Sequence, residues 1–421
     1  MLKHNQHWAG KMPDSGIKRD ITSSLIPALH IHPIIVITGA RRSGKSYLFR
    51  QLISHLVEND IPPVNILFIN FEDPYFTLHR NSVDLLDKIM HEYKIQKNPM
   101  GKIYCFFDEI QNIPNWNLWI REVYDRDDTV KFLLTGSNSE MLSIDLATHL
   151  TGRIIAFENF PFSFQEYVLS LPNLPLPHPI TYENAFPYQE TIIHLLEERM
   201  QKGLFPELIK MENFELEKEM LNQYFQNVLF KDIIPRFSIR NSKTIEQLAY
   251  YCSNTFATRY SFRNLAKAVS SNENTVKEYL SYLERAYLFF SVEPFEYSFK
   301  RQIRYDKKLY IADNGLRNAT SSSFSPDYGR AAENMVFTHL RRESKTIYFW
   351  QDPKTGKEID FIVKKKTGYH LLNISYTDNL HEREWDTFSI FLNNSNLQET
   401  QFTVISRNRY ETIIHDGCYC Q

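Results

Sequence analysis

The sequence predicts a multidomain α/β protein whose first domain contains a parallel β-sheet. Three observations support this fold class. Over roughly the first 160 residues, short apolar runs alternate with helical patterns, as in parallel sheets that helices cover on both faces. The middle of the chain contains two helical patterns separated by a short polar turn. Roughly the last 120 residues return to strand-like runs, which predict a second α/β or α+β domain.

The composition is that of a globular protein without membrane-spanning or secretory segments. The chain has 421 residues, which suffice for two to four domains, and 43% of them are hydrophobic. No run approaches the ~18 apolar residues of a transmembrane helix, and the N-terminal segment has no apolar centre like that of a signal peptide. The one close cysteine pair, Cys418 and Cys420, lacks further zinc ligands nearby. We therefore expect a reduced, cytoplasmic protein with no membrane partner.

The first domain is predicted to span residues 1–168, where buried strands alternate with helices. Nearly continuous apolar runs predict strands at residues 34–38, 66–70, 103–107, 131–135 and 153–157. The intervening helical patterns lie at residues 45–57, 82–93 and 116–124. This alternation predicts right-handed crossovers and a parallel sheet.

A loop of the form G-x-x-x-x-G-K-S joins the first strand to the first long helix. Its glycines allow backbone N–H groups to surround phosphate oxygens, and the helix adds its positive N-terminal end. In this motif Lys45 reaches the β- and γ-phosphates, and Ser46 ligates Mg²⁺. Because the chain has only 13 glycines, a random match has a probability on the order of 10⁻². The predicted nucleotide-binding residues are Gly39, Ala40, Arg41, Arg42, Ser43, Gly44, Lys45, Ser46 and Tyr47.

Two acidic residues at the end of the 103–107 strand complete the predicted site. Asp108 is expected to hold Mg²⁺ at the carboxyl edge of the sheet, and Glu109 to orient or deprotonate the attacking water. Lys45 and Glu109 are thus the predicted catalytic residues, and ATP and Mg²⁺ are the predicted ligands. A glutamate at this position favours a nucleotide-hydrolysing protein of the motor type over a nucleotide kinase.

Other polar residues near this edge are open to two interpretations. Ser137 and Asn138 either sense the γ-phosphate or form an ordinary turn after their strand. Arg153 is either a charge-stabilising arginine supplied to a neighbouring subunit or a solvated surface charge. Residues 70–73, which include Glu72, either line the same edge or form a plain loop.

The middle of the chain is predicted to be largely helical. Residues 169–240 are expected to form a proline-rich linker and a lid-like helical region, and five prolines between residues 170 and 187 argue against a regular helix there. Residues 241–298 are predicted to form a winged-helix-like domain. Its two helices and its wing strand are expected at residues 261–269, 274–286 and 288–292. This helix pair serves either as a packing unit or as a DNA-reading element.

Residues 299–421 are predicted to form the last domain, with strands and two helices. The apolar, strand-like runs lie at residues 308–312, 346–350, 359–363, 370–375 and 401–406. The helical patterns lie at residues 333–342 and 382–392.

Several motifs spread over nearly the whole chain bear on its family. They are GARRSGKS (39–46), INFEDP (69–74), FFDEIQNIPNW (106–116), LTGSNSEML (134–142), LTGR (150–153), FPFSFQEY (160–167), KGLFPE (202–207), LFKDII (229–234), KLYIADNGLR (308–317) and GRAAENMVFTHL (329–340). Together they resemble a widespread prokaryotic family in which an AAA-type P-loop ATPase domain precedes a C-terminal domain of unknown function. The resemblance implies ATP binding and hydrolysis, and the C-terminal region of that family is similar to the PD-(D/E)xK nuclease fold.

The similarity to a nuclease can be examined at particular residues. Such a nuclease holds its metal with an acid near a helix, an acid on a strand, and Glu-x-Lys on the next strand, and the metal activates water. By this resemblance Glu333 and Asp360 match the first two positions. The next strand carries Asn373 and Ser375 where the glutamate and the lysine belong. The predicted nuclease site is therefore degenerate, and we expect this domain to be catalytically inactive.

Three functional hypotheses follow from the sequence. The leading one is an Mg²⁺-dependent ATPase that couples hydrolysis to conformational change in the winged-helix and nuclease-like domains. The alternative is a nucleotide-regulated DNA-binding module. The basic segments 300–308 and 364–366 either contact a phosphate backbone in such a module or are solvated turns between strands. The net charge of −2 restricts any DNA-binding surface to a local patch. A metal-dependent nuclease is the third. ATP is the expected partner, while DNA and a second copy of the chain are partners that the sequence leaves open.

Overall fold

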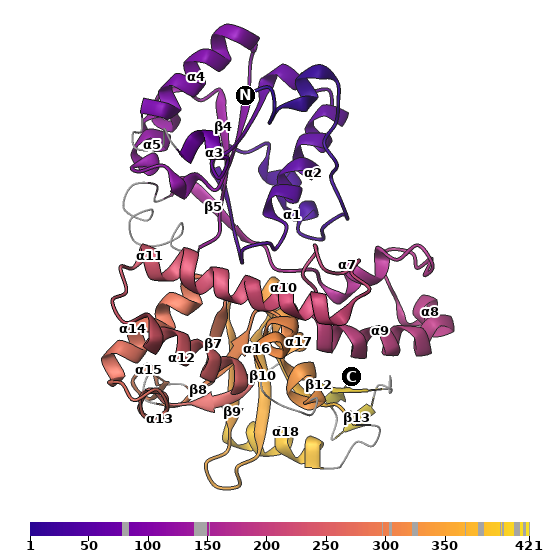
Figure 1. The fold of residues 1–421 in the computed structure, drawn as a ribbon. Coiled ribbons are helices and arrows are strands. Elements are labelled where there is room, and N and C mark those ends of the chain that lie inside the picture. The colour runs from indigo at the N-terminus through magenta and orange to yellow at the C-terminus, as the bar shows by residue number, and fades with distance from the viewer. Residues whose placement is uncertain are drawn as a thin grey trace. The chain divides into compact units, whose positions relative to one another are not determined.

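The computed structural model describes residues 1–421 except 78–83, 139–149, 151, 297, 303–304, 322–326, 367, 378–382, 396, 398–399, 408–412, 416–417 and 421. Parts of the motifs at 134–142 and 150–153 lie outside the described residues. The chain divides into two compact units, Met1–Phe162 with Arg285–Tyr287, and Ser163–Glu284 with Leu288–Gln421. Figure 1 labels the elements of both units.

The first unit contains a five-stranded sheet in which every pair of neighbouring strands is parallel. The strand order is β2-β3-β4-β1-β5. The strands are β1 (Ile34–Thr38), β2 (Ile66–Asn70), β3 (Ile103–Asp108), β4 (Val130–Gly136) and β5 (Ile154–Glu158). The five predicted runs therefore form one parallel sheet, which confirms the predicted fold class of this region. Their carboxyl ends meet at one edge, so the loops that follow all five strands converge there.

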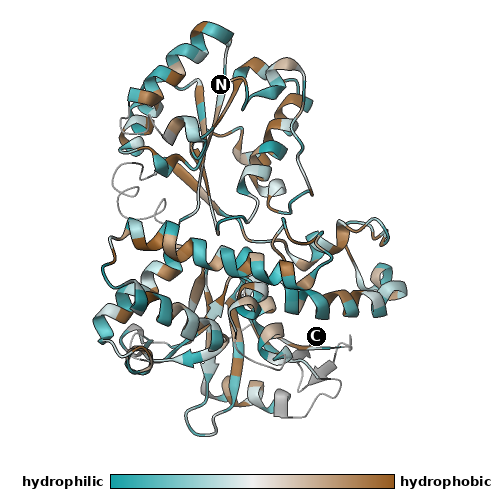
Figure 2. Ribbon diagram, in the orientation of Figure 1, coloured by the Kyte–Doolittle hydropathy of each residue, from teal (hydrophilic) through white to brown (hydrophobic). Residues whose placement is uncertain are grey.

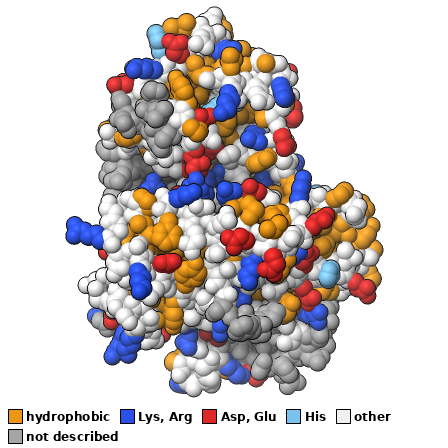
Figure 3. Space-filling model, in the orientation of Figure 1, with side chains coloured by type: hydrophobic (Ala, Val, Ile, Leu, Met, Phe, Trp, Pro, Cys, Tyr) orange, Lys and Arg blue, Asp and Glu red, His pale blue; other side chains and the backbone are white. Residues whose placement is uncertain are grey.

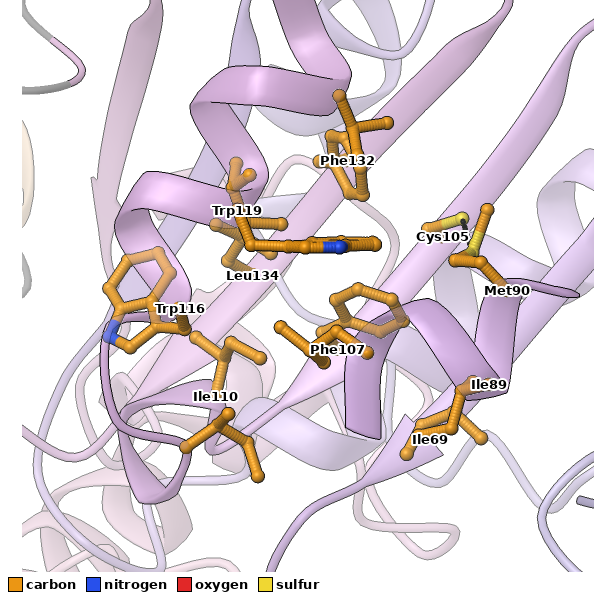
Figure 4. Close-up of a cluster of buried hydrophobic side chains, with 14 of the residues drawn as sticks. Ile69, Ile89, Met90, Cys105, Phe107, Ile110, Trp116, Trp119, Phe132 and Leu134 are labelled. Carbon is orange, nitrogen blue, oxygen red and sulfur yellow. Dashed lines mark hydrogen bonds between the residues drawn. The ribbon is translucent and has the colours of Figure 1, made fainter. Parts of the chain in front are cut away.

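Helices cover both faces of this sheet because alternate residues of the strands point to opposite faces. One core joins Ile35, Ile37 and Phe106 to α1 (Thr22–Ala28) and α2 (Lys45–Glu58). On the other face α4 (Asp84–Lys97) and α5 (Trp116–Arg126) pack on the sheet. Figure 4 shows the labelled side chains of this second core, where the rings of Phe107, Trp119 and Phe132 contact one another. The strands are accordingly hydrophobic along their length in Figure 2.

The N-terminal residues protect the exposed edge strand β2. The Asn5 side chain pairs with the backbone of Phe68, donating to its carbonyl at 2.8 Å and accepting from its N–H at 2.6 Å. The Trp8 indole donates to the carbonyl of Ile66 at 2.8 Å. Side chains thus satisfy backbone groups that an edge strand would otherwise leave open to another strand. The short helices of this unit are η1 (Gln6–Ala9), η2 (Pro63–Asn65), α3 (Pro74–Thr77) and η3 (Ile110–Asn112).

The second unit begins with a helical region. Its elements are α7 (Phe164–Leu169), α8 (Tyr182–Ala185), η5 (Phe186–Tyr188), α9 (Gln189–Lys202), α10 (Phe214–Asn227), the π-helix η6 (Val228–Ile233) and α11 (Ile234–Arg236). One detail differs from the prediction, because the proline-rich stretch contains the single-turn helix α8. Thr181 caps α8 through a capping box with Asn184, and Pro179 and Pro187 flank the helix without interrupting it.

A helix pair and three short antiparallel strands follow. The elements are α12 (Ser242–Asn254), β6 (Thr258–Tyr260), α13 (Phe262–Ala268), α14 (Glu273–Arg285), β7 (Phe289–Pro294), α15 (Phe299–Gln302), β8 (Lys307–Ile311) and α16 (Asn314–Thr320). Ser261 and Asn272 accept backbone hydrogen bonds at the starts of α13 and α14, and these N-terminal caps stabilise the start of each helix. Both β6 and β7 pair with β8.

The remaining strands extend the same sheet. The elements are α17 (Tyr328–Glu343), β9 (Ile347–Gln351), β10 (Glu358–Lys364), β11 (Tyr369–Ser375), α18 (Arg383–Asn394), β12 (Thr400–Ser406), β13 (Ile413–His415) and β14 (Cys418–Cys420). The sheet is mixed, with the order β13-β14-β12-β11-β10-β9-β7-β8-β6. Strands from the predicted domains 241–298 and 299–421 therefore share one sheet. Among the described residues, no helix has the length and apolar character needed to cross a membrane.

Candidate nucleotide-binding site

The loop from Gly39 to Ser46 leaves the carboxyl end of β1 and enters α2. Gly39 has a φ of +152°, and a Cβ atom there would lie 1.9 Å from the carbonyl oxygen of Asn159. Gly44 has a φ of +96°, in the region that favours glycine. Both glycines of the motif therefore have backbone conformations that favour glycine, and no larger residue fits at Gly39.

Two residues that the sequence did not point to brace this loop. The Asn159 amide donates to the Ser43 carbonyl at 2.9 Å and to its hydroxyl at 3.1 Å. The Arg19 guanidinium donates to the same carbonyl at 2.9 Å and to the Phe160 carbonyl at 2.7 Å. Asn159 has a sequence signal, since a polar residue follows the fifth apolar run, whereas nothing around Arg19 distinguishes it. Hydrogen bonds from Asn159, which follows β5, and from Arg19, which precedes α1, thus hold the loop in place.

Lys45 is 5% exposed, and its ammonium contacts three oxygen atoms. Its ammonium donates to the carbonyls of Gly39 and Ala40, at 3.1 Å each, and lies 3.5 Å from a carboxylate oxygen of Glu109. The loop therefore holds the Lys45 ammonium against its own backbone carbonyls. A phosphate offers the same kind of oxygen ligand with more negative charge.

Ser46 and Asp108 meet at the sheet edge, as predicted. The Ser46 hydroxyl donates to Asp108 Oδ2 at 2.6 Å, and Thr135 donates to the other carboxylate oxygen. Burial and the neighbouring Glu109 carboxylate raise the pKa of Asp108, while the bonds from Ser46 and Thr135 oppose that rise.

A hydroxyl and a carboxylate oxygen are the hard ligands that Mg²⁺ prefers, and a buried carboxylate gains from a cation, so Ser46 and Asp108 fit this metal. No group of three or more His, Cys, Asp or Glu arranged for a metal occurs in the described part of the chain. Mg²⁺ does not require one, because it keeps several of its waters.

Glu109 is held in an unusual backbone conformation. Its φ of +54° is left-handed, and its N–H donates to Thr135 Oγ1 at 2.9 Å. The Ser137 N–H donates to Glu109 Oε2 at 3.1 Å, and the Gln111 amide contacts the same oxygen. Burial would raise the pKa of Glu109, but the charge of Lys45 and these hydrogen bonds hold it below its usual value. A strained, ionised carboxylate at a sheet edge is typical of a functional residue.

Of the residues left open by the sequence, Ser137 and Asn138 lie at the site and Arg153 does not. Asn138 is buried, and Ser137 contacts Glu109 through its backbone. Arg153 precedes Ile154, which pairs with Ile34 at the amino end of β1. The phosphate loop follows Thr38, four residues after Ile34 in β1. At roughly 3.3 Å per residue, Arg153 therefore lies more than 10 Å along the sheet from the edge that carries this loop. Its guanidinium donates two hydrogen bonds to Asp125, at 2.8 and 3.2 Å.

The end of β2 also contributes to this edge. Glu72 accepts a hydrogen bond from the Arg41 guanidinium at 2.8 Å. Ser46, Asp108, Asn70 and Glu72 are among the residues that line a cavity of about 450 Å³. The interpretation of residues 70–73 as part of the site edge is therefore supported by their position.

Tyr47, the last residue of the predicted set, is partly exposed at the start of α2. Its ring packs on Gly16 and lies 4.6 Å from the Arg50 guanidinium carbon. Tyr47 thus presents an aromatic surface on the side of the loop that faces the N-terminal segment.

Comparison with known proteins places this site in a family. An AAA domain matches residues 31–168, and two domains of unknown function, DUF8612 and DUF4143, match residues 193–327 and 328–418. The uncharacterised protein MJ1544 of Methanocaldococcus jannaschii is 31% identical over 405 residues, which span 93% of this chain and 85% of that protein. The chain belongs to this family of AAA-domain proteins.

Two further similarities accompany that match. An uncharacterised protein of Haemophilus influenzae is 26% identical to this AAA-domain protein over 358 residues, which span 83% of this chain and 85% of that one. Among solved structures, the Walker-type ATPase PABY2304 of Pyrococcus abyssi aligns with a TM-score of 0.46 and 16% identity, covering 72% of this chain and 95% of that one.

In the C-terminal unit of this AAA-domain protein, Glu333 and Asp360 come together around a buried lysine. Lys308, whose side chain is 4% exposed, lies 2.9 Å from Glu333 and 3.1 Å from Asp360 and also pairs with Glu358. Tyr310 donates to Glu333 at 2.7 Å. The cation among these carboxylates is thus a side chain of the protein itself.

The position of Lys308 corrects one expectation and adds a missed residue. Both interpretations of the basic segment 300–308, as a contact for a phosphate backbone or as a solvated turn, leave its lysines exposed, but Lys308 is buried in this cluster. Asn373, in the place of the nuclease glutamate, accepts from the Asp360 N–H at 3.3 Å. The lysine comes from β8, far from β11 in sequence, so the local Glu-x-Lys pattern contained no signal for it.

Proposed function

We propose that this protein binds ATP with Mg²⁺ and hydrolyses it to ADP and phosphate. The observation that carries the proposal is the convergence of Lys45, the Ser46–Asp108 pair and Glu109 at one edge of a parallel sheet. A P-loop alone supports nucleotide binding, whereas the buried, ionised glutamate beside it supports hydrolysis. The AAA domain matched over residues 31–168 agrees with this assignment.

Each residue has a distinct role in this proposal. Lys45 would exchange its carbonyl and carboxylate partners for the β- and γ-phosphate oxygens. Mg²⁺ held by Ser46 and Asp108 would neutralise charge on the same phosphates. Glu109 would accept the proton of the attacking water, and its hydrogen bonds with Gln111 and Ser137 would hold the carboxylate in place.

Hydrolysis is proposed to drive conformational change in the rest of the chain, with the predicted domains 1–168, 169–240, 241–298 and 299–421 as the moving parts. The support is a series of hydrogen bonds within the first unit. Ser43 of the phosphate loop is bonded to Asn159, and Arg19 links Ser43 to Phe160. The second unit begins three residues later, at Ser163. A shift of the loop on binding γ-phosphate would therefore reach the connection between the units.

The test is ATP hydrolysis measured on the full chain, with Lys45→Ala as the comparison. We expect Mg²⁺-dependent release of phosphate by the parent and loss of both tight ATP binding and turnover in Lys45→Ala. Equal turnover by the two proteins would overturn the proposal.

DNA binding is the second candidate, supported by the order helix, strand, helix pair and antiparallel strands between α12 and β8. Arg263, Lys267 and Lys277 are exposed on the helix pair, but so are Glu273 and Glu278. Figure 3 likewise shows basic and acidic side chains intermixed on the face in view. A mobility-shift assay at low and raised salt, with and without ATP, tests this candidate, and the absence of a shift at low salt would exclude it.

A metal-dependent nuclease is the least supported function. Lys308 already supplies the cation among Glu333, Glu358 and Asp360. We expect no Mg²⁺- or Mn²⁺-dependent DNA cleavage, and cleavage that disappears in Asp360→Ala would contradict this expectation.

A further inference from the structure

We propose that Arg41, inside the phosphate loop, is the arginine that stabilises charge on the γ-phosphate, so that each chain completes its own catalytic site. This inference rests on the proposed ATP hydrolysis and names a further residue for it. It differs from the expectation that Arg153 of a neighbouring subunit supplies this charge.

Phosphoryl transfer needs positive charge near the γ-phosphate oxygens, and in many P-loop enzymes an arginine provides it from the same chain or from a partner. Arg153 is badly placed to serve its own site, since it lies at the amino end of β5 and is bonded to Asp125 through two nitrogens. The arginine must therefore come from another position or another chain.

Arg41 lies at the correct edge of the sheet. It follows Gly39 by two residues, and its Nη2 donates to Glu72 Oε1 at 2.8 Å. Glu72 comes two residues after β2 and lines the same cavity as Ser46 and Asp108. The charge of Arg41 also helps to lower the pKa of Glu109. Arg41 is thus bonded to a residue that lines the same cavity as the metal-binding pair.

Two of the three cationic residues of the loop, Lys45 and Arg41, have parallel arrangements. Lys45 lies beside Glu109, which follows β3, and Arg41 is bonded to Glu72, which follows β2. The Arg41 and Glu72 side chains are 29% and 45% exposed, so their pair is partly solvated and easily exchanged. A γ-phosphate carries more charge than a carboxylate and matches the fork of a guanidinium, so it can replace Glu72 as the partner of Arg41.

In the reaction, the oxygen of water forms a bond to the γ-phosphorus while the bond from that phosphorus to the β–γ bridging oxygen breaks. The water proton passes to Glu109, and the electron pair of the broken bond stays on the terminal oxygen of ADP. Arg41 donates hydrogen bonds to the oxygens on which charge develops and undergoes no covalent change. Glu72 is a positioning residue that holds Arg41 before ATP binds.

The test compares Arg41→Ala with Arg126→Ala in the full chain. Arg126 is a matched control, because it is an exposed arginine in an ion pair with Glu122 on α5. Three quantities are measured: binding of fluorescent ADP, capture of ADP with aluminium fluoride as a transition-state mimic, and turnover over a range of protein concentrations. A second variant, Glu72→Gln, tests the positioning role through the ratio of ATP to ADP affinity.

We expect Arg41→Ala to bind ADP within about threefold of the parent, to lose the aluminium fluoride complex, and to lose about 10²- to 10³-fold in kcat. Parent turnover per chain should not depend on protein concentration, Arg126→Ala should match the parent, and Glu72→Gln should bind ATP more tightly with ADP affinity unchanged. Normal capture of aluminium fluoride by Arg41→Ala would overturn the inference, as would parent turnover that rises steeply with concentration and is lost in Arg153→Ala. If the parent hydrolyses ATP and Lys45→Ala does not, the proposed function stands whatever Arg41 does; if the parent does not hydrolyse ATP, both fail.

Discussion

Replacing Lys308 by Met should destabilise the C-terminal unit strongly, because it leaves three carboxylates around a buried apolar side chain. The ammonium has carboxylate oxygens of Glu333 and Asp360 at 2.9 and 3.1 Å and also pairs with Glu358. Removing one partner of a buried ion pair typically costs about 3–5 kcal/mol, because the remaining charge has no counter-ion. At about 2–4 °C per kcal/mol for a unit of this size, the melting temperature should fall by about 6–20 °C.

The loss of stability caused by Lys308→Met should increase with pH. Burial and Asp360 raise the pKa of Glu333 to about 7 even though Lys308 opposes the rise. Without Lys308 this pKa must be higher still. A carboxyl whose folded pKa exceeds its unfolded value binds more protons in the folded state, so stability is lost as pH rises from the unfolded value through the folded one. Lys308→Met should therefore be closer to the parent at pH 6 than at pH 8.

Thermal melting of the full chain at both pH values, with Lys307→Met as the control, tests this reasoning. Lys307 is the preceding residue on β8 and forms a more exposed pair with Glu293 at 3.0 Å, so its loss should cost no more than about 1 kcal/mol. We also expect Mg²⁺ to raise the melting temperature of Lys308→Met and to leave that of Lys307→Met unchanged. If the two variants melt together at pH 8, or if the Lys308→Met deficit is larger at pH 6, the account of the cluster is wrong.

Two further outcomes follow from the first unit. Gly39→Ala should abolish ATP binding, measured by fluorescence of a labelled nucleotide, because its Cβ would lie 1.9 Å from the Asn159 carbonyl oxygen. The control Gly329→Ala should bind normally, because its Cβ would meet nothing closer than 3.9 Å. Retained binding in Gly39→Ala would mean that the loop geometry is wrong. Burial, followed by the charge of Lys102, lowers the pKa of Lys131 to about 7, so the folded state binds fewer protons than the unfolded state between about pH 7 and 10.5. Stability to urea should therefore rise with pH through that window, and the rise should shrink in Lys131→Met; an unchanged slope would exclude Lys131 as its source.

The sheet of the first unit was predictable because its strands are buried on both faces. A continuous apolar run such as residues 34–38 leaves little choice of structure when a helical pattern follows it. The positions of Lys45, Ser46, Asp108 and Glu109 follow from the same logic, since the carboxyl ends of parallel strands meet at one edge.

Contacts set by long-range register were not predictable in this way. Arg19 reaches Ser43 and Phe160, and Lys308 reaches acids on α17 and β10, only after distant segments have paired. Arg153 illustrates the converse, because a residue near the site motifs in sequence lies at the far edge of the sheet once β5 pairs in parallel with β1. A motif thus predicts which residues gather at one loop. The residues that hydrogen-bond to them or compensate their charge depend on the whole fold.

The central claim, that Glu109 activates water for ATP hydrolysis, is tested most directly by Glu109→Gln. The amide keeps the size of the side chain and removes its capacity to accept a proton. ATP affinity and phosphate release should be measured on the same preparation. We predict ATP binding within a few-fold of the parent and turnover reduced by about 10²-fold or more. Turnover at the parent rate, with ATP bound normally, would contradict the assignment of Glu109 as the base.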